Sequence, residues 1–325
     1  MRFSKLITVL FLFSMLIAGC SPDDTDKSDG KDEGLTIYTS IYPLQYFAER
    51  IGQHNVDVKS IIPPGADGHT YEPTTRELVK VAESDMLIYN GAGFEGFVEK
   101  AKESLKKQDV VFVNASRDIQ SSGHEEENHE EENHEDGNHE EDEHGHEEAH
   151  GHGDVDPHFW LDPVQAIQMA ETIKKEMIAL HPEKKDEFEA NFQQLKKDLS
   201  DLDRDFKELV ENAKRKEFIV AHSAYGKWER YGLKQISIAG LSPSHEPSQK
   251  EIQAIIDYAR ENEVKYIIFE KNYTSDVAEM IQREVKAEKL YLSNLESLTE
   301  EQVQNKEDYL NIMYDNLDTL KTALN

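Results

Sequence analysis

Residues 124–154 combine eight histidines with fifteen acidic residues and contain no lysine or arginine. Imidazole is a good ligand for borderline metals such as Zn²⁺, and carboxylates add charge and further ligand atoms. The segment has almost no apolar side chains with which to build a core, so we expect a disordered loop that holds metal ions weakly. The alternative is a solvated acidic spacer, but a spacer has no need of regularly placed histidines. The histidines are His124, His129, His134, His139, His144, His146, His150 and His152.

Six further histidines lie outside this loop, and three of them stand where a binding crevice is expected. His54 and His181 lie in polar stretches and are interpreted as surface residues, and His245 as a solvated loop residue. The candidate ligands lie at the ends of predicted strands or in tight turns beside predicted helices, which are the positions that face a crevice in α/β proteins. They are His69, His158, His222 and Glu270.

The elements that must position these residues alternate between strand and helix, which predicts α/β lobes with parallel sheets. In the first half we expect strands at 35–39, 56–62, 86–89 and 110–113 and helices at 43–51, 74–82, 94–106 and 163–180. In the second half we expect strands at 218–221, 235–239, 266–269 and 289–292 and helices at 224–231, 248–261, 275–285 and 301–324.

Between the two halves, apolar residues recur at alternating spacings of four and three, which predicts one long amphipathic helix over 182–214. Such a face fits either a coiled-coil dimer seam or a helix that lies across two lobes of the same chain. The face consists of Phe188, Phe192, Leu195, Leu199, Leu202, Phe206 and Leu209.

The chain has 325 residues and a formal net charge of −30, half of which belongs to the His/acid loop. An acidic surface argues against nucleic acid as a partner, because phosphates are bound by lysine and arginine. The length allows one large domain or two lobes of roughly 100–150 residues each.

The N-terminus has the pattern of an export signal. A basic start is followed by an apolar run over 6–18 that is too short for a comfortable membrane span, and the run ends in Ala18-Gly19-Cys20. Cys20 is the only cysteine, so no intrachain disulfide is possible. The segment resembles a bacterial lipoprotein signal with Cys20 as the acylated residue, and residues 20–34 have the composition of a tether. We therefore expect a protein that is exported and then anchored to the cell membrane by lipid.

Five stretches together resemble the zinc-binding branch of the metal-specific solute-binding lipoproteins of bacterial ABC transporters. The resemblance covers essentially the whole mature chain, in order, including the His-rich insertion. The stretches are PPGADGHTYEP at 63–73, DPHFWLDP at 156–163, AHSAYG at 221–226, AGLSPSHEPS at 239–248 and IIFE at 267–270.

The resemblance implies a two-lobed α/β fold with a long linking helix and one Zn²⁺ in the cleft between the lobes. His69 and His158 would come from the first lobe, and His222 and Glu270 from the second. The fourth ligand varies in this family, so water or another carboxylate is an alternative to Glu270. Phe159 and Trp160 would shield the site from water, and Asp162 or a nearby carbonyl could orient an imidazole. The partner would be an ABC permease, and we expect a monomer.

Three other functions compete with zinc delivery. Manganese-binding relatives generally have a carboxylate where this chain has His222, and such a change hardens a site toward Mn²⁺. A zinc hydrolase would use three histidines and a water, but the chain has no His-Glu-x-x-His helix. A surface adhesin or scaffold whose loop is only a metal-dependent glue would not need four ligands at strand ends.

The expected organisation of the chain runs in seven parts. These are a signal peptide at 1–19, a tether at 20–34, an N-terminal lobe at 35–123, the His/acid loop at 124–154, the end of the N-terminal lobe at 155–181, a linking helix at 182–214 and a C-terminal lobe at 215–325.

Overall fold

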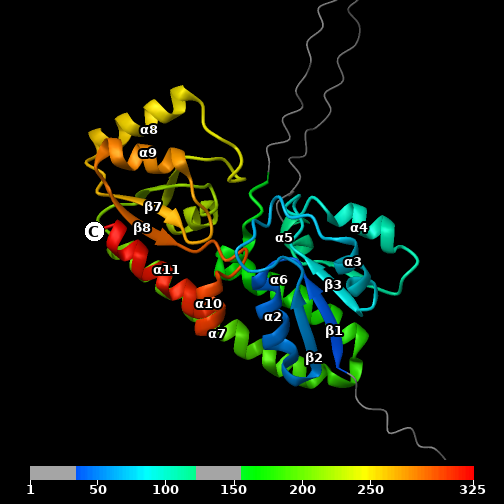
Figure 1. Ribbon diagram of the computed structural model, residues 1–325. Coiled ribbons are helices and arrows are strands. Elements are labelled where there is room, and N and C mark those ends of the chain that lie inside the picture. The colour runs from blue at the N-terminus through cyan, green and yellow to red at the C-terminus, as the bar shows by residue number, and fades with distance from the viewer. Residues whose placement is uncertain (1–33, 122–154) are drawn as a thin grey trace, which may run out of the picture. The chain divides into compact units, whose positions relative to one another are not determined.

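A computed structural model describes residues 34–121 and 155–325. The predicted signal peptide, most of the tether with Cys20, and the eight histidines of the loop at 124–154 lie outside the described residues. Within the described part the chain forms two four-stranded parallel sheets with helices packed on them (Figure 1). This confirms the α/β class and the two sheets that the alternating pattern predicts.

The first sheet has the strand order β2-β1-β3-β4, and all its pairings are parallel. Its central strand β3 is buried on both faces, which is why it is a continuous apolar run in the sequence. The elements are β1 (Leu35–Thr39), α2 (Tyr42–Gly52), β2 (Val56–Ser60), α3 (Thr75–Ala82), β3 (Met86–Tyr89), α4 (Val98–Leu105), β4 (Val111–Asn114) and α5 (Arg117–Ser121).

Helix α4 begins four residues later than the sequence predicts. Gly91, Ala92 and Gly93 all have positive φ, at 88°, 53° and 74°. Three consecutive left-handed residues form a tight loop that a right-handed helix cannot include. The side chain of Glu95 also turns back to accept hydrogen bonds from this loop. The predicted start at Phe94 was therefore wrong, because the loop chemistry prevailed over the apolar spacing.

The long helix is intramolecular. Helix α6 (Pro163–Leu180) leads through a short 3₁₀ turn (Pro182–Lys184) into α7 (Lys185–Asn212), which packs against α2, α6 and α11. Six of its seven predicted apolar positions are buried in the main core, with Leu209 partly buried beside it. The amphipathic face is thus covered by helices associated with both sheets, and the coiled-coil interpretation is not needed to explain it.

The second sheet has the order β6-β5-β7-β8 and is also parallel throughout. Helices α8 and α9 lie together on one face of it, and α11 packs against β8 (Figure 1). The elements are β5 (Glu217–Val220), β6 (Lys234–Ser237), α8 (Gln249–Glu261), β7 (Tyr266–Glu270), α9 (Asp276–Val285), β8 (Glu288–Leu292), α10 (Glu300–Asn305) and α11 (Tyr309–Ala323).

Two helices of this half differ from the prediction. The helix expected at 224–231 is a 3₁₀ helix at Gly226–Tyr231, which ends at Gly232 in the left-handed region. The single terminal helix expected at 301–324 is two helices, because Lys306 is left-handed (φ 55°) and Asp308 caps the start of α11. None of the helices in the described ranges is both long and apolar enough to cross a membrane.

Candidate metal centre

The first candidate ligand lies in the turn that follows β2. His69 donates its backbone N–H to Asp67 Oδ1 at 2.9 Å, an Asx-type bond that fixes the turn. Its ring packs on Phe94 with the centroids 4.4 Å apart. A Cβ on the neighbouring Gly68 would lie 2.6 Å from the Phe94 ring, so the close approach of this turn requires glycine.

The second candidate ligand lies in the turn before α6. His158 is fully buried, and its Nδ1 and backbone N both lie within hydrogen-bonding distance of Asp156 Oδ1, at 2.8 and 3.0 Å. A carboxylate at Nδ1 holds the proton there and leaves Nε2 as the free donor atom, as is common for metal-binding histidines. The residue that orients this imidazole is therefore Asp156. Asp162, the residue suggested by the sequence, instead caps α6 and pairs with Arg230.

The third candidate ligand follows β5. His222 is fully buried, with Nδ1 3.0 Å from Glu270 Oε1 and Nε2 2.8 Å from the carbonyl oxygen of Leu241. Glu270 is the last residue of β7 and is also buried. Its other contacts are Tyr225, whose hydroxyl lies 3.4 Å from Oε1, and Asn294, whose Nδ2 lies 3.3 Å from Oε2. Glu270 thus contacts the ring of His222 and lies next to the other histidines only through that ring.

A carboxylate that the sequence reasoning missed completes the group. Glu296 lies four residues after β8 and is almost fully buried. Its Oε1 is 3.4 Å from His69 Nε2 and 3.6 Å from His158 Nε2, and its Oε2 accepts a hydrogen bond from Gly68 N at 3.3 Å. The available signal was an acidic residue in a partly apolar loop at the carboxyl end of a predicted strand, which is the same logic that selected Glu270.

The three predicted histidines and Glu296 converge on one point. Each offers one ligand atom, and these four atoms all lie within 4.8 Å of one another. The ring centroids of His69, His158 and His222 are 5.3 to 5.7 Å apart. The Nε2 atoms of His69 and His158 are buried and have no hydrogen-bond partner among the residues that the structure describes. Buried polar atoms are nearly always satisfied, so two unpaired imidazole nitrogens aimed at one carboxylate indicate a cation site.

The charges in the site depend strongly on one another. Burial lowers the pKa of His222, but the negative charge of Glu270 and the hydrogen bond to it outweigh that effect and raise the pKa to about 9. Burial likewise disfavours charge on Glu296, yet its contacts with His158 and His69 hold its pKa well below the usual range. The pKa of His158 is raised despite burial, because Asp156 and Glu296 stabilise its charged form. The imidazoles of His222 and His158 therefore hold protons more strongly than free histidines do, and these protons compete with a metal ion for the site.

Aromatic side chains wall the site, though not both of those expected. Trp160 is fully buried, lies 5.3 Å from His158 between ring centroids, and donates Nε1–H to Asn294 O at 2.7 Å. Phe94, which the sequence reasoning did not single out, packs on His69. Phe159 packs elsewhere, beneath the ammonium group of Lys227. His245 is exposed and is not one of the four grouped residues.

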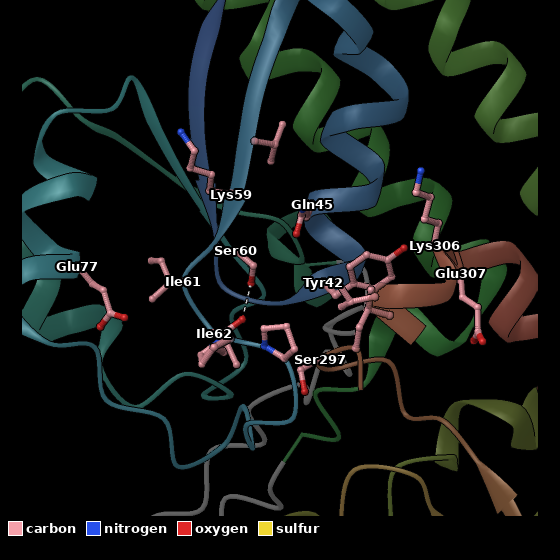
Figure 2. A pocket seen from close by; sticks show the side chains of 15 residues that line it. Tyr42, Gln45, Lys59, Ser60, Ile61, Ile62, Glu77, Ser297, Lys306 and Glu307 are labelled. Carbon is pink, nitrogen blue, oxygen red and sulfur yellow. Dashed lines mark hydrogen bonds between the residues drawn. The ribbon is translucent and has the colours of Figure 1, made fainter. Parts of the chain in front are cut away.

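A separate pocket of about 570 Å³ is lined by residues that neighbour two of the ligand segments in the sequence (Figure 2). It is lined from one side by Ile61, Ile62 and the two prolines that precede the His69 turn, and from the other by Ser297, which follows Glu296. Ser60 donates its hydroxyl to Ile62 O at 2.9 Å inside it. None of the four converging ligands lines this pocket, so it is not the metal centre.

The chain is similar to known proteins over nearly its whole length. The chain is 36% identical over 326 residues to the high-affinity zinc uptake system protein ZnuA of Bacillus subtilis, covering 99% of this chain and 98% of that protein. It is 33% identical over 322 residues to the zinc-binding lipoprotein AdcA of Streptococcus pneumoniae, of which it spans only 60%.

Among solved structures, the Zn(II)-bound ZnuA-like domain of Streptococcus pneumoniae AdcA superposes with a TM-score of 0.71 at 31% identity, covering 90% of this chain and 99% of that domain. The model of the family described as zinc-uptake complex component A, periplasmic, matches residues 37–323. The chain therefore belongs to the ZnuA family of zinc-uptake solute-binding proteins, as the sequence motifs suggested.

Proposed function

We propose that this protein captures one Zn²⁺ outside the cytoplasm through His69, His158, His222 and Glu296 and delivers it to an ABC permease for uptake. The observation that carries the ligand assignment is the convergence of four ligand atoms within 4.8 Å. At this point two buried imidazole nitrogens have no hydrogen-bond partner within residues 34–121 and 155–325. Zinc uptake itself is the function of the family.

The donor set suits zinc. Three imidazoles and one carboxylate form the four-ligand, borderline set that Zn²⁺ accepts in tetrahedral sites. Manganese prefers more oxygen ligands, and this site offers a histidine at position 222. Glu270 was predicted as the fourth ligand; we now propose Glu296 in that role and Glu270 as the group that orients His222.

Asn294 supports both carboxylates. Its Nδ2 lies 3.3 Å from Glu270 Oε2 and 3.1 Å from Glu296 Oε1, and its Oδ1 accepts the backbone N–H of Glu296 at 3.2 Å. One buried amide thus spaces two negative charges that would otherwise repel each other. Asp156 contacts Nδ1 of His158, and Glu270 contacts Nδ1 of His222. Each of these two imidazoles therefore has a supporting carboxylate besides Glu296.

The loop that carries Glu296 connects the site to both halves of the fold. Two of its backbone carbonyl oxygens accept hydrogen bonds from the first half of the fold. Glu296 O accepts from Tyr42 N at 3.2 Å, and Leu298 O accepts from Gly65 N at 2.8 Å. On the other side Ser293 N donates to Asn316 Oδ1 at 2.9 Å. A cation bound by His69 and His158 of the first half and by His222 and Glu296 of the second would therefore set the relation between the halves, which gives the permease a shape difference between loaded and empty protein.

Family membership supports a position outside the cytoplasm and work with an ABC permease. We further propose a lipid anchor at Cys20, on the sequence pattern that surrounds it, and a monomeric protein. We also propose that no bond is made or broken. Catalytic zinc sites keep an open position for water, whereas four protein ligands would close this one.

The ligand assignment is tested by zinc titration of the full chain against a chromophoric chelator. We expect the His222→Ala variant to bind zinc more than about 100-fold more weakly, because losing a ligand should exceed the 10- to 100-fold effect of losing a supporting group. The matched control is His54→Ala, an exposed histidine of the same chain, which should bind as the parent does. Unchanged binding by the His222→Ala variant would mean that the site is misplaced.

A further inference from the structure

A buried carboxylate outside the ligand set, Glu95, has no direct contact with the metal centre. It is almost fully buried, and among residues 34–121 and 155–325 no lysine or arginine forms an ion pair with it. Burying a carboxylate is costly unless its oxygens are hydrogen-bonded, so its partners should explain why it is there.

Those partners all belong to the end of the first sheet. Glu95 Oε1 accepts hydrogen bonds from Ser40 Oγ at 2.5 Å and from Asn90 N at 2.6 Å, and Oε2 accepts from Gly91 N at 3.1 Å. The carboxylate thereby ties the end of β1 to the loop that leaves β3. That loop holds the three left-handed residues 91–93, a conformation that persists only when its surroundings determine it.

The folded loop then contacts two of the proposed ligands' segments. On one side, Asn90 Nδ2 donates a hydrogen bond at 3.0 Å to the carbonyl oxygen of Pro157, which is the residue directly before His158. On the other side, the Phe94 ring packs on the His69 ring at 4.4 Å between centroids. Glu95 is thus connected to the segments of both His69 and His158 through one intervening residue each, Phe94 and Asn90.

We propose that Glu95 is a positioning residue of the metal centre, which acts through Asn90 on His158 and through Phe94 on His69. This inference rests on the proposed ligand role of those two histidines. Without the carboxylate, the backbone N–H groups of Asn90 and Gly91 lose their acceptor and the loop loses its anchor to Ser40. Both imidazoles would then sample a wider range of orientations, and a metal site tolerates little of that.

The test compares three variants of the full chain. Glu95→Gln replaces an accepting oxygen by an amide donor, Asn90→Ala removes the side-chain hydrogen bonds to Pro157 O and Gly91 O, and Ser84→Ala is the matched control. Ser84 is a buried polar residue just before the same strand β3, at its opposite end, where its hydroxyl bonds Val81 O at 2.7 Å. Zinc affinity is measured by chelator competition, and the visible spectrum of the Co²⁺-loaded protein reports ligand geometry.

We expect about tenfold weaker zinc binding for Glu95→Gln and for Asn90→Ala, with a changed Co²⁺ spectrum, and parent-like behaviour for Ser84→Ala at a comparable loss of thermal stability. If Glu95→Gln fails to fold by circular dichroism, Asn90→Ala alone decides. Parent-like affinity and Co²⁺ spectrum in the folded variants would overturn the inference and make Glu95 a purely structural residue.

A parallel pair separates this inference from the ligand assignment. His69→Ala and His158→Ala should each weaken zinc binding far more than Glu95→Gln. If they do while Glu95→Gln and Asn90→Ala have no effect, only the positioning role fails. If neither histidine variant weakens binding, the proposed site itself is wrong and the role of Glu95 fails with it.

Discussion

Glu296 and Glu270 are both buried carboxylates beside the histidine cluster, but their neighbours differ. Glu296 Oε1 lies 3.4 and 3.6 Å from two imidazole nitrogens that have no other partner in the described part of the chain, whereas Glu270 contacts the ring of His222 and the hydroxyl of Tyr225. A carboxylate that faces several free donor atoms is placed to share a cation with them. One that is bonded to a single imidazole is placed to hold that ring.

This difference predicts an order of effects. Glu296→Gln should weaken zinc binding more than about 100-fold, because it removes a charged ligand, and Glu270→Gln should weaken it about 10- to 100-fold, because it removes a supporting group. Both substitutions keep side-chain size, so both proteins should fold. The measurement is chelator competition on the two variants side by side. The reverse order would restore Glu270 as the fourth ligand.

The site also predicts a pH dependence. Zinc binding needs an unprotonated imidazole, and the pKa of His222 in the zinc-free protein is about 9. Displacing this proton should make the apparent zinc affinity rise by at least about tenfold per pH unit up to about pH 9, rather than level off near 6.5. Isothermal titration in buffers of different ionisation enthalpy would count the released protons, and a plateau already at pH 7 would contradict the prediction.

The same group affects the zinc-free protein in the opposite sense. Because the folded pKa of His222 lies above its ordinary value of 6.5, its ion pair with Glu270 contributes stability that is fully present below pH 6.5 and is lost as the pH rises through 9. Alkaline conditions thus weaken the empty protein while they favour loading.

Two elements hold the candidate site in place. Helix α7 buries its apolar face against α2, α6 and α11. Because α2 packs on the first sheet and α11 on the second, α7 supports both sheets. The segment after β8 forms hydrogen bonds with the turn that carries His69, including Ser297 Oγ to Ala66 O at 2.8 Å. Helix α7 supports the two sheets, and the segment after β8 places Glu296 beside His69 and His158.

The role of α7 predicts a stability effect without a binding effect. Leu199 is fully buried in the middle of its apolar face. Leu199→Ala should reduce the free energy of unfolding by about 2–5 kcal/mol, because it leaves a cavity. Lys196→Ala, on the exposed face of the same helix, should change it by less than about 0.5 kcal/mol. Urea denaturation of the zinc-free proteins measures the free energy of unfolding of both variants. Equal losses for Leu199→Ala and Lys196→Ala would contradict the packing of this apolar face against the other helices.

At the scale of the whole molecule, the chain has two distinct sets of histidines. Eight lie in the acidic segment at 124–154, and three converge with Glu296 within the described part of the fold. We propose that the acidic segment gathers zinc with weak, rapidly exchanging sites while the converging set binds it tightly. Fixed geometry with supporting carboxylates favours the second set.

Replacing all eight histidines of the segment by glutamine should therefore leave one tight zinc per protein. Its affinity should stay within about twofold of the parent, since none of the tight ligands has changed, while the number of weakly bound ions falls. Equilibrium dialysis followed by elemental analysis measures both quantities. Loss of the tight ion in this variant would place the site in the segment and overturn the assignment.

Local patterns in the amino-acid sequence were enough to predict the α/β class, the long helix and the three histidines that converge in the fold. Alternating apolar runs make parallel strands, a four-three spacing makes an amphipathic face, and the ends of such strands face a crevice. The motifs around His69, His158 and His222 identified the family. The lobe boundaries at 181 and 215 and the lipid anchor at Cys20 stay predictions.

It is the folded chain that places Glu296, and not Glu270, among the grouped ligand atoms. Glu296 and Glu270 both follow or end strands of one sheet, and local pattern does not distinguish them. The choice depends on hydrogen bonds between residues more than 200 positions apart, such as Gly68 N to Glu296 Oε2. The loop at 91–93 and the break at Lys306 were likewise fixed by left-handed residues and caps that apolar spacing does not record.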